Sequence, residues 1–172
     1  MIKLMGAVLV IFSCSVLGFQ KVLQKRTTLA AMEELQELLL SIEQRISFNL
    51  EPLPELFLHL AAQRNVEETS FLFRLVSALR EGEGSALGEA WHRALESFSQ
   101  ETGLSIEVKS LMQSLGQDLG TMDYETEGTR LCRGAKILGD CIKKEKKALA
   151  QSEKTFKSLG VLSGICIVIV LI

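Results

Sequence analysis

Two histidines and four cysteines are the side chains with which this chain of 172 residues could bind a metal ion or form a nucleophile. Glu89 and His92 have the Glu-x-x-His spacing of carboxylate-bridged di-metal bundles, which need two copies of the motif and two further glutamates. The matching position before His59 is Leu56, so the second copy is missing. We therefore expect no metal site, and interpret His92 as an exposed or capped helix residue.

The cysteines also lack the spacing of a disulfide or zinc site. Cys132 and Cys141 are nine residues apart, which places them on opposite faces of one helix, about 13 Å apart along its axis. Cys14 and Cys166 lie in uncharged apolar stretches, where cysteine is usually a small apolar filler. There is neither a Gly-x-x-x-x-Gly-Lys-Ser/Thr phosphate loop nor a Gly-x-Ser-x-Gly nucleophile elbow. We expect no catalytic residue and no cofactor, and the net charge of -2 gives no reason to expect nucleic acid.

Apolar residues recur at three- and four-residue steps through the middle of the chain, which predicts a series of amphipathic helices. The predicted core positions are Leu29, Met32, Leu35, Leu39, Ile42, Ile46, Leu53, Leu56, Phe57, Leu60, Phe71, Leu72, Leu75, Val76, Leu79, Leu87, Trp91, Leu95, Phe98, Ile106, Val108, Leu111, Met112, Leu115 and Leu119. Breaks are expected at residues 49–54, near Asn65, at 81–85, at 102–103 and near Gly120. The expected N-caps are Thr27 or Thr28, Thr69 or Ser70, Ser85 and Asp123.

From Asp123 onward no proline interrupts the chain, and one helix of about 70 Å could extend to its end. Its apolar seam contains Leu131, Leu138, Ile142, Leu149 and Phe156. The seam is typical either of a bundle within one chain or of a coiled coil with a second copy, so homo-oligomerisation stays open. Glycines at 128, 134 and 139 disfavour an isolated rod. The predicted fold class is therefore all-α, an antiparallel helical bundle.

The two ends of the chain are apolar and uncharged over residues 4–19 and 159–172. A membrane span needs about 20 such residues, so both segments are short, although flanking lysines could reach the interface. Buried core helices are the alternative for either segment, and a cleaved signal peptide is a further alternative for the first. We favour two uncleaved anchors. The predicted organisation is an N-terminal anchor at 1–23, a helical bundle at 24–157 and a C-terminal transmembrane segment at 158–172.

Basic residues gather beside both apolar segments, on the side of the middle region. Because positive charge is retained in the cytoplasm, this pattern predicts a cytoplasmic bundle. The same side chains are candidate contacts to anionic headgroups, and a solvated helix face is the simpler interpretation. The candidate membrane-surface residues are Lys21, Lys25, Arg26, Lys154 and Lys157.

Several short motifs in a fixed order resemble the stage III sporulation protein AB family of endospore-forming bacteria. They lie at residues 3–7, 41–46, 52–53, 90–91, 115–123 and 156–164, and the last contains Lys157-Ser158-Leu159-Gly160 at the start of the final apolar segment. The soluble region of that family is similar to the cytoplasmic domains of type II secretion F proteins. The resemblance therefore implies an F-like bundle between two transmembrane helices.

The resemblance also implies a function. It points to a non-catalytic membrane platform in the secretion-like complex between mother cell and forespore, located in the mother-cell membrane with its soluble domain in the mother-cell cytoplasm. The implied partners are a secretion-type ATPase, the stage III sporulation protein AA, and other membrane proteins of the stage III sporulation A operon. Gly116, Gly120 and Asp123 match the family's glycine and aspartate pattern, and we interpret them as a helix junction or a partner contact. An adaptor or receptor without an ATPase partner is the alternative, and a small membrane enzyme a third candidate.

Overall fold

The computed structural model describes residues 2–49, 52–63, 67–82, 87–120 and 123–171; side-chain surroundings within 2–19, 47–49, 153–154 and 156–171 are outside the description. The described residues form six α-helices and no strand, which confirms the all-α class. The helices are α1 (Ile2–Asn49), α2 (Leu53–Gln63), α3 (Phe71–Glu81), α4 (Leu87–Thr102), α5 (Ile106–Gln117) and α6 (Tyr124–Leu171).

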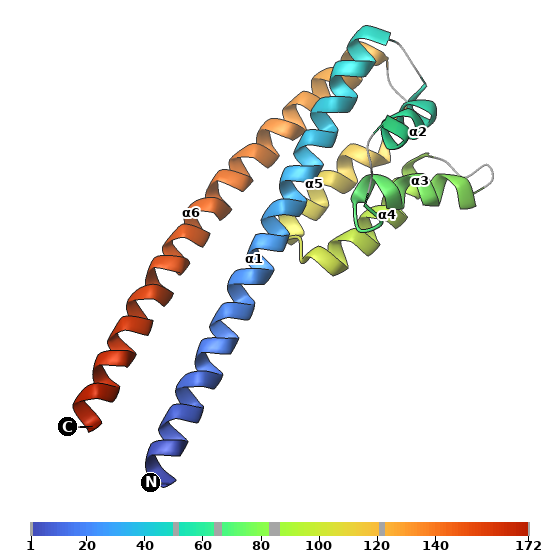
Figure 1. Cartoon of the computed structure of the whole chain (residues 1–172). Helices are drawn as coiled ribbons and strands as arrows, with labels where there is room; N and C mark the ends of the chain where they lie inside the picture. The colour runs from blue at the N-terminus through green and yellow to red at the C-terminus, as the bar shows by residue number, and fades with distance from the viewer. Residues whose placement is uncertain (1, 50–51, 64–66, 83–86, 121–122, 172) are drawn as a thin grey trace.

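The two long helices form an antiparallel hairpin in which the start of α1 and the end of α6 lie at the same end (Figure 1). The seam residues Leu131, Leu138 and Ile142 of α6 are buried, and α1 is the main partner of α6. Gln36 Nε2 donates to the Ala135 carbonyl oxygen across the hairpin at 3.0 Å. The apolar seam of α6 therefore packs against α1 of the same chain.

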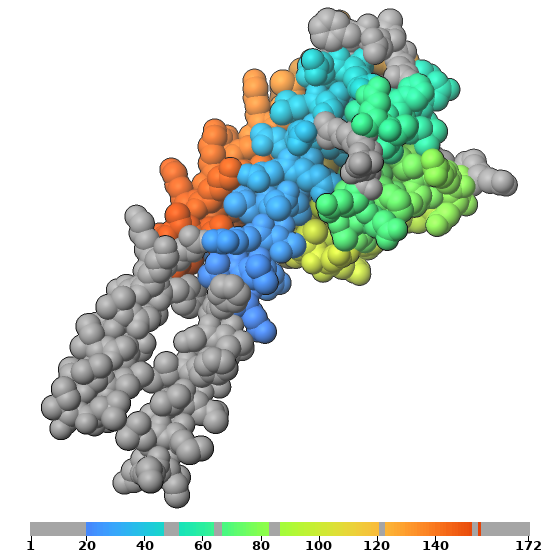
Figure 2. All heavy atoms as spheres, viewed as in Figure 1, coloured from blue at the N-terminus to red at the C-terminus, as the bar shows by residue number. Residues whose placement is uncertain are grey.

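The four short helices project from one side of the hairpin, on its half away from the termini (Figure 2). They cover the apolar face of α1 that the three- and four-residue spacing predicted, because Leu35, Leu39 and Ile42 are fully buried there. Between α3 and α4, Phe71 packs edge-on against Trp91, with ring centroids 4.8 Å apart, and against Phe98, with ring centroids 5.7 Å apart.

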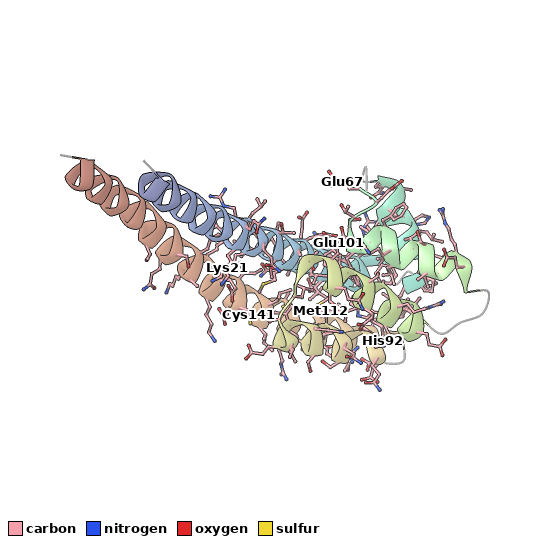
Figure 3. The ribbon with its side chains drawn as sticks, turned by 90° about the horizontal axis from the view of Figure 1, so that it is seen from below. Lys21, Glu67, His92, Glu101, Met112 and Cys141 are labelled. Carbon is pink, nitrogen blue, oxygen red and sulfur yellow. The ribbon has the colours of Figure 1, made fainter. Side chains whose placement is uncertain are left out.

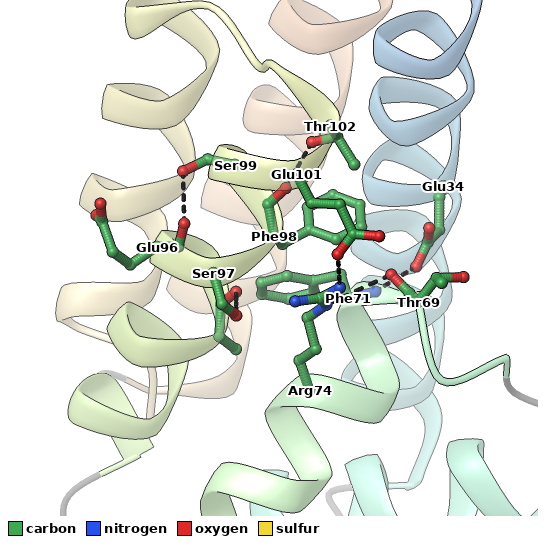
Figure 4. Close-up of polar contacts among 11 residues, drawn as sticks. Glu34, Thr69, Phe71, Arg74, Glu96, Ser97, Phe98, Ser99, Glu101 and Thr102 are labelled. Atoms are coloured by element: carbon green, nitrogen blue, oxygen red, sulfur yellow. Dashed lines mark hydrogen bonds and ion pairs between the residues drawn. The ribbon is translucent and has the colours of Figure 1, made fainter.

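Local capping fixes where the short helices begin. Ser70 caps α3 by accepting from Phe73 N, as predicted, and Ser105 caps α5 in the same way. The first N–H of α3, from Phe71, is satisfied by Glu34 of α1 at 2.7 Å (Figure 4). Through this bond α1 positions α3.

Two local predictions are wrong. Thr27 and Thr28 do not begin a helix, because α1 continues through them and their hydroxyls lie 3.3 and 3.1 Å from the carbonyl oxygens of Leu23 and Gln24. Ile106 is not a core residue: its side chain is 86% exposed, because it lies in the first turn of α5 on the face opposite Val108.

Among the residues whose side chains the structure describes, no helical stretch is long and apolar enough to cross a membrane. The predicted anchors are residues 1–23 and 158–172, and the side chains of 1–19 and 158–172 lie outside the description, as does the predicted N-cap Ser85. The predicted boundaries at 23/24 and 157/158 fall inside α1 and α6. The anchors and the division of the chain therefore stay predictions.

Candidate functional site

Two glycines bring α4 and α5 into close contact. A Cβ atom on Gly116 would lie 1.9 Å from Trp91 Cδ1, and one on Gly88 would lie 3.3 Å from the carbonyl oxygens of Gly116 and Gln117. Trp91 is buried, and its Nε1 donates to the carbonyl oxygen of Met112 at 2.9 Å. The indole therefore occupies the space that the absent side chain at Gly116 leaves.

The turn between α5 and α6 follows directly. Gly120 has φ of +82°, a conformation that favours glycine. Asp123 then caps α6 by accepting from the N–H of Thr126 at 3.1 Å. The hydroxyl and the backbone N–H of Thr126 together lower the pKa of the Asp123 carboxyl. Gly116, Gly120 and Asp123 thus lie along one helix junction, and their role as a partner contact stays a prediction.

A buried ion pair supports this junction from the side of α6. Glu127 is only 2% exposed and accepts from the N–H of Gly120 at 3.0 Å. Arg130 lies 3.3 Å from Glu127, pairs with Asp118 at 3.1 Å and donates to the Leu115 carbonyl oxygen at 2.8 Å. One guanidinium therefore joins the end of α5 to the first turns of α6.

An open groove of about 810 Å³ lies beside this junction. Its floor is mainly apolar, from Leu87, Trp91 and Leu119, and polar side chains form its rim. The lining residues are Gly82, Leu87, Gly88, Glu89, Trp91, His92, Arg93, Gln113, Gln117 and Leu119. An apolar floor with a polar rim is a composition found in many binding grooves.

Among the described residues, the side chains singled out for metal or thiol chemistry do not gather into a metal site. Glu89 and His92 are exposed on the groove rim, and His92 is labelled in Figure 3. In the ranges described, no three histidine, cysteine, aspartate or glutamate side chains come together in a way that could hold a metal ion. Cys132 and Cys141 are free, half-buried thiols.

Of the candidate membrane-surface residues, Lys21, Lys25 and Arg26 are exposed on α1. Lys154 and Lys157 lie outside the residues whose side chains are described.

A family model for stage III sporulation protein AB matches residues 3–172. The chain belongs to the stage III sporulation protein AB family. It is also similar to the stage III sporulation protein AB of Bacillus subtilis (strain 168), with 25% identity over 99% of each chain. No solved structure matches the chain. Membership of this family implies a role in sporulation, and the family's description names no catalytic activity.

The sequence indicated Gly116, Gly120 and Asp123 but not the residues that act with them. Trp91 was expected in the core, yet its contact with Gly116 joins positions 25 apart in the chain. The bond from the N–H of Gly120 to Glu127 was not predicted. The sequence does contain a signal for this bond, since a carboxylate four residues after an N-cap aspartate can reach back to the preceding turn.

Proposed function

We propose that the chain is a non-catalytic membrane platform of a sporulation secretion-like complex, which couples a secretion-type ATPase to membrane channel subunits. Its localisation in this proposal is the mother-cell membrane, with helices α2–α5 in the cytoplasm. The ATPase is the stage III sporulation protein AA, and the channel subunits are other products of the same operon.

The observation that carries the proposal is the α1–α6 hairpin. It brings the two uncharged terminal segments to one end of the molecule and leaves the short helices near the other (Figure 1). This arrangement suits a protein that is held in a bilayer at one end and bound by a soluble partner at the other. The basic residues beside both segments favour the cytoplasm for the short helices.

We further propose the groove beside Gly116 as the surface that the ATPase contacts. Its floor is apolar, with Leu87 half-buried and Trp91 and Leu119 buried behind it, so an apolar side chain of the partner would pack there. Glu89, His92 and Gln113 around it are exposed, so substitutions there can change binding without disturbing the core.

The test is co-purification of the full-length chain with the ATPase from detergent-solubilised membranes. His92→Glu and Gln113→Glu introduce a charge on the groove rim, and we expect each to weaken recovery of the ATPase by about tenfold, the effect of roughly 1.4 kcal/mol. Ser110→Glu is the matched control, because Ser110 is exposed on α5 but does not line the groove.

The outcomes separate the parts of the proposal. Recovery of the chain in the aqueous fraction before detergent is added would contradict the proposed membrane anchoring. A membrane-bound chain that retains no ATPase would favour the adaptor without an ATPase partner. If both groove variants retain the ATPase fully, the partnership with the ATPase stands, and this groove is excluded as the surface that the ATPase contacts.

A further inference from the structure

The corner between α4 and α5 is attached to α1 close to its N-terminal apolar segment. The Thr28 hydroxyl donates to the carbonyl oxygen of Thr102 at 2.7 Å and lies 3.5 Å from that of Gly103. Gly103 has φ of +67° and turns the chain from α4 into α5. The height of this corner along the hairpin is therefore fixed by Thr28.

Helix α5 runs antiparallel to α6, with its first turn nearest the chain termini. Ser105 and Val108 line the same cavity as Lys144 of α6, whereas Leu115 near the other end of α5 accepts from Arg130. Because Cα–Cβ bonds in a helix tilt toward its N-terminus, side chains in the first turn of α5 lean toward the same end of the hairpin.

The side chain at the tip of this corner is apolar and open to solvent. Ile106 is 86% exposed, more than any other large apolar residue whose surroundings the structure describes. Most of the surface of this side chain is therefore available for a contact outside the chain.

Basic residues of both long helices lie beside the corner. Lys21 and Lys25 of α1 and Lys144 of α6 line a cavity of about 400 Å³ with Ser105. Lys21 and Cys141, which also lines this cavity, are labelled in Figure 3. Two glutamates, Glu107 and Glu145, also line it, so lysines outnumber carboxylates three to two. An exposed apolar side chain next to lysines is the pattern of a protein surface that rests on anionic lipid.

The distance along α1 is suitable for such a contact. Thr28 lies nine residues after Phe19, the last residue of the uncharged segment, which corresponds to about 13 Å of helix. The headgroup layer occupies about 5–8 Å of that length, and transmembrane helices tilt by about 20° on average. A tilt toward α5 brings the side chain of Ile106, which points toward the bilayer, to the headgroups.

We propose that the α4–α5 corner is a third membrane contact, in which Ile106 enters the headgroup layer and Lys21, Lys25 and Lys144 face anionic phospholipid. The inference rests on the membrane anchoring proposed above. Together with the two anchors, a third contact fixes the orientation of the short helices relative to the bilayer.

The test uses the full-length chain in nanodiscs, with nitroxide labels on single cysteines in a background whose native cysteines are replaced by alanine. The labelled positions are Ile106→Cys, Ile137→Cys and the native Cys14. Ile137 is the matched control, because it is also an exposed isoleucine (46%) but lies farther along α6 from the apolar end. Collision rates of each label with oxygen and with a nickel chelate report its depth.

In nanodiscs with equal parts phosphatidylglycerol and phosphatidylcholine, we expect the oxygen-to-nickel ratio at position 106 to exceed that at 137 by about twofold or more. In phosphatidylcholine alone the difference should shrink. A ratio at 106 equal to that at 137, with Cys14 in hydrocarbon, would overturn the inference and leave Ile106 for a protein partner. Cys14 in water would overturn the anchoring itself, and equal ratios at 106 in both lipids would exclude the role of the lysines.

Discussion

Replacement of Gly116 by alanine tests how closely α4 and α5 pack. The added Cβ would lie 1.9 Å from Trp91 Cδ1 and 2.3 Å from Nε1, whereas carbon atoms in contact are about 3.5 Å apart or more. The indole must therefore shift by roughly 1.5 Å. That shift breaks or strains the 2.9 Å bond from Trp91 to the Met112 carbonyl oxygen.

The magnitude follows from three contributions to the free energy of unfolding. Overpacking of a core costs about 1–3 kcal/mol, and loss of a buried hydrogen bond costs about 1–3 kcal/mol. Alanine in a helix gains about 1 kcal/mol over glycine. We expect Gly116→Ala to destabilise the protein by about 3 kcal/mol, a fall in Tm of roughly 6–12 °C for a chain of this size.

Two further glycines provide matched controls for the same substitution. A Cβ on Gly134 would lie 2.5 Å from Leu115 Cδ1, a buried side chain that can rotate only against its neighbours. On Gly139 it would lie 2.6 Å from Gln36 Nε2, the end of a flexible side chain. The order of destabilisation should therefore be Gly116, then Gly134, then Gly139, with Gly139→Ala close to neutral because the helix gain offsets the lost Gln36 bond.

The assay is thermal unfolding followed by circular dichroism, together with the emission of the single tryptophan, Trp91. Gly116→Ala should shift that emission to longer wavelength, and Gly139→Ala should leave it unchanged. An unaltered Tm and emission for Gly116→Ala would refute the close packing, as would equal losses in the Gly116 and Gly139 variants.

Two other predictions concern charge. Arg130→Leu should destabilise the protein by about 2–3 kcal/mol in urea unfolding, because it leaves Glu127 buried with Gly120 N–H as its remaining described partner. A double variant that adds Glu127→Gln should recover part of this loss. Equal losses in the single and double variants would contradict the reasoning. Burial raises the pKa of Glu34 despite the bond from Phe71, so the folded state takes up this proton at higher pH than the unfolded chain. The wild type should therefore gain stability relative to Glu34→Gln as the pH falls from neutral toward 4.5, and lose that gain as the pH rises through the raised pKa of Glu34. A difference in Tm between the two proteins that does not change with pH would show that the raised pKa does not affect stability.

The helix boundaries that depend on local signals were predictable from the sequence. Ser70 and Asp123 are N-caps as expected, because a short polar side chain before an apolar run satisfies the free N–H groups of the first turn. Pro52 lies in the break between α1 and α2, where proline cannot continue the helix. The apolar face of α1 was also correct, since its spacing alone determines which residues share a side.

Positions that depend on distant parts of the chain were not predictable in this way. A threonine hydroxyl can cap a helix or bond back to the preceding turn, and Thr27 does the second because α1 is already helical there. Ile106 and Val108 lie on opposite faces of α5, and the sequence alone does not specify that Val108 is the one that faces the core. The fit of Trp91 over Gly116 likewise requires the register between two helices.

Continuity of the two long helices has a mechanical consequence. Neither α1 nor α6 has a break along its 48 residues, and such a helix is about 72 Å long. A hairpin of this kind acts as a lever. A tilt of roughly 5° applied at the short helices would displace the far ends by roughly 6 Å, which is about one turn of helix. Small motions at one end are thereby enlarged to the scale on which neighbouring helices change their register.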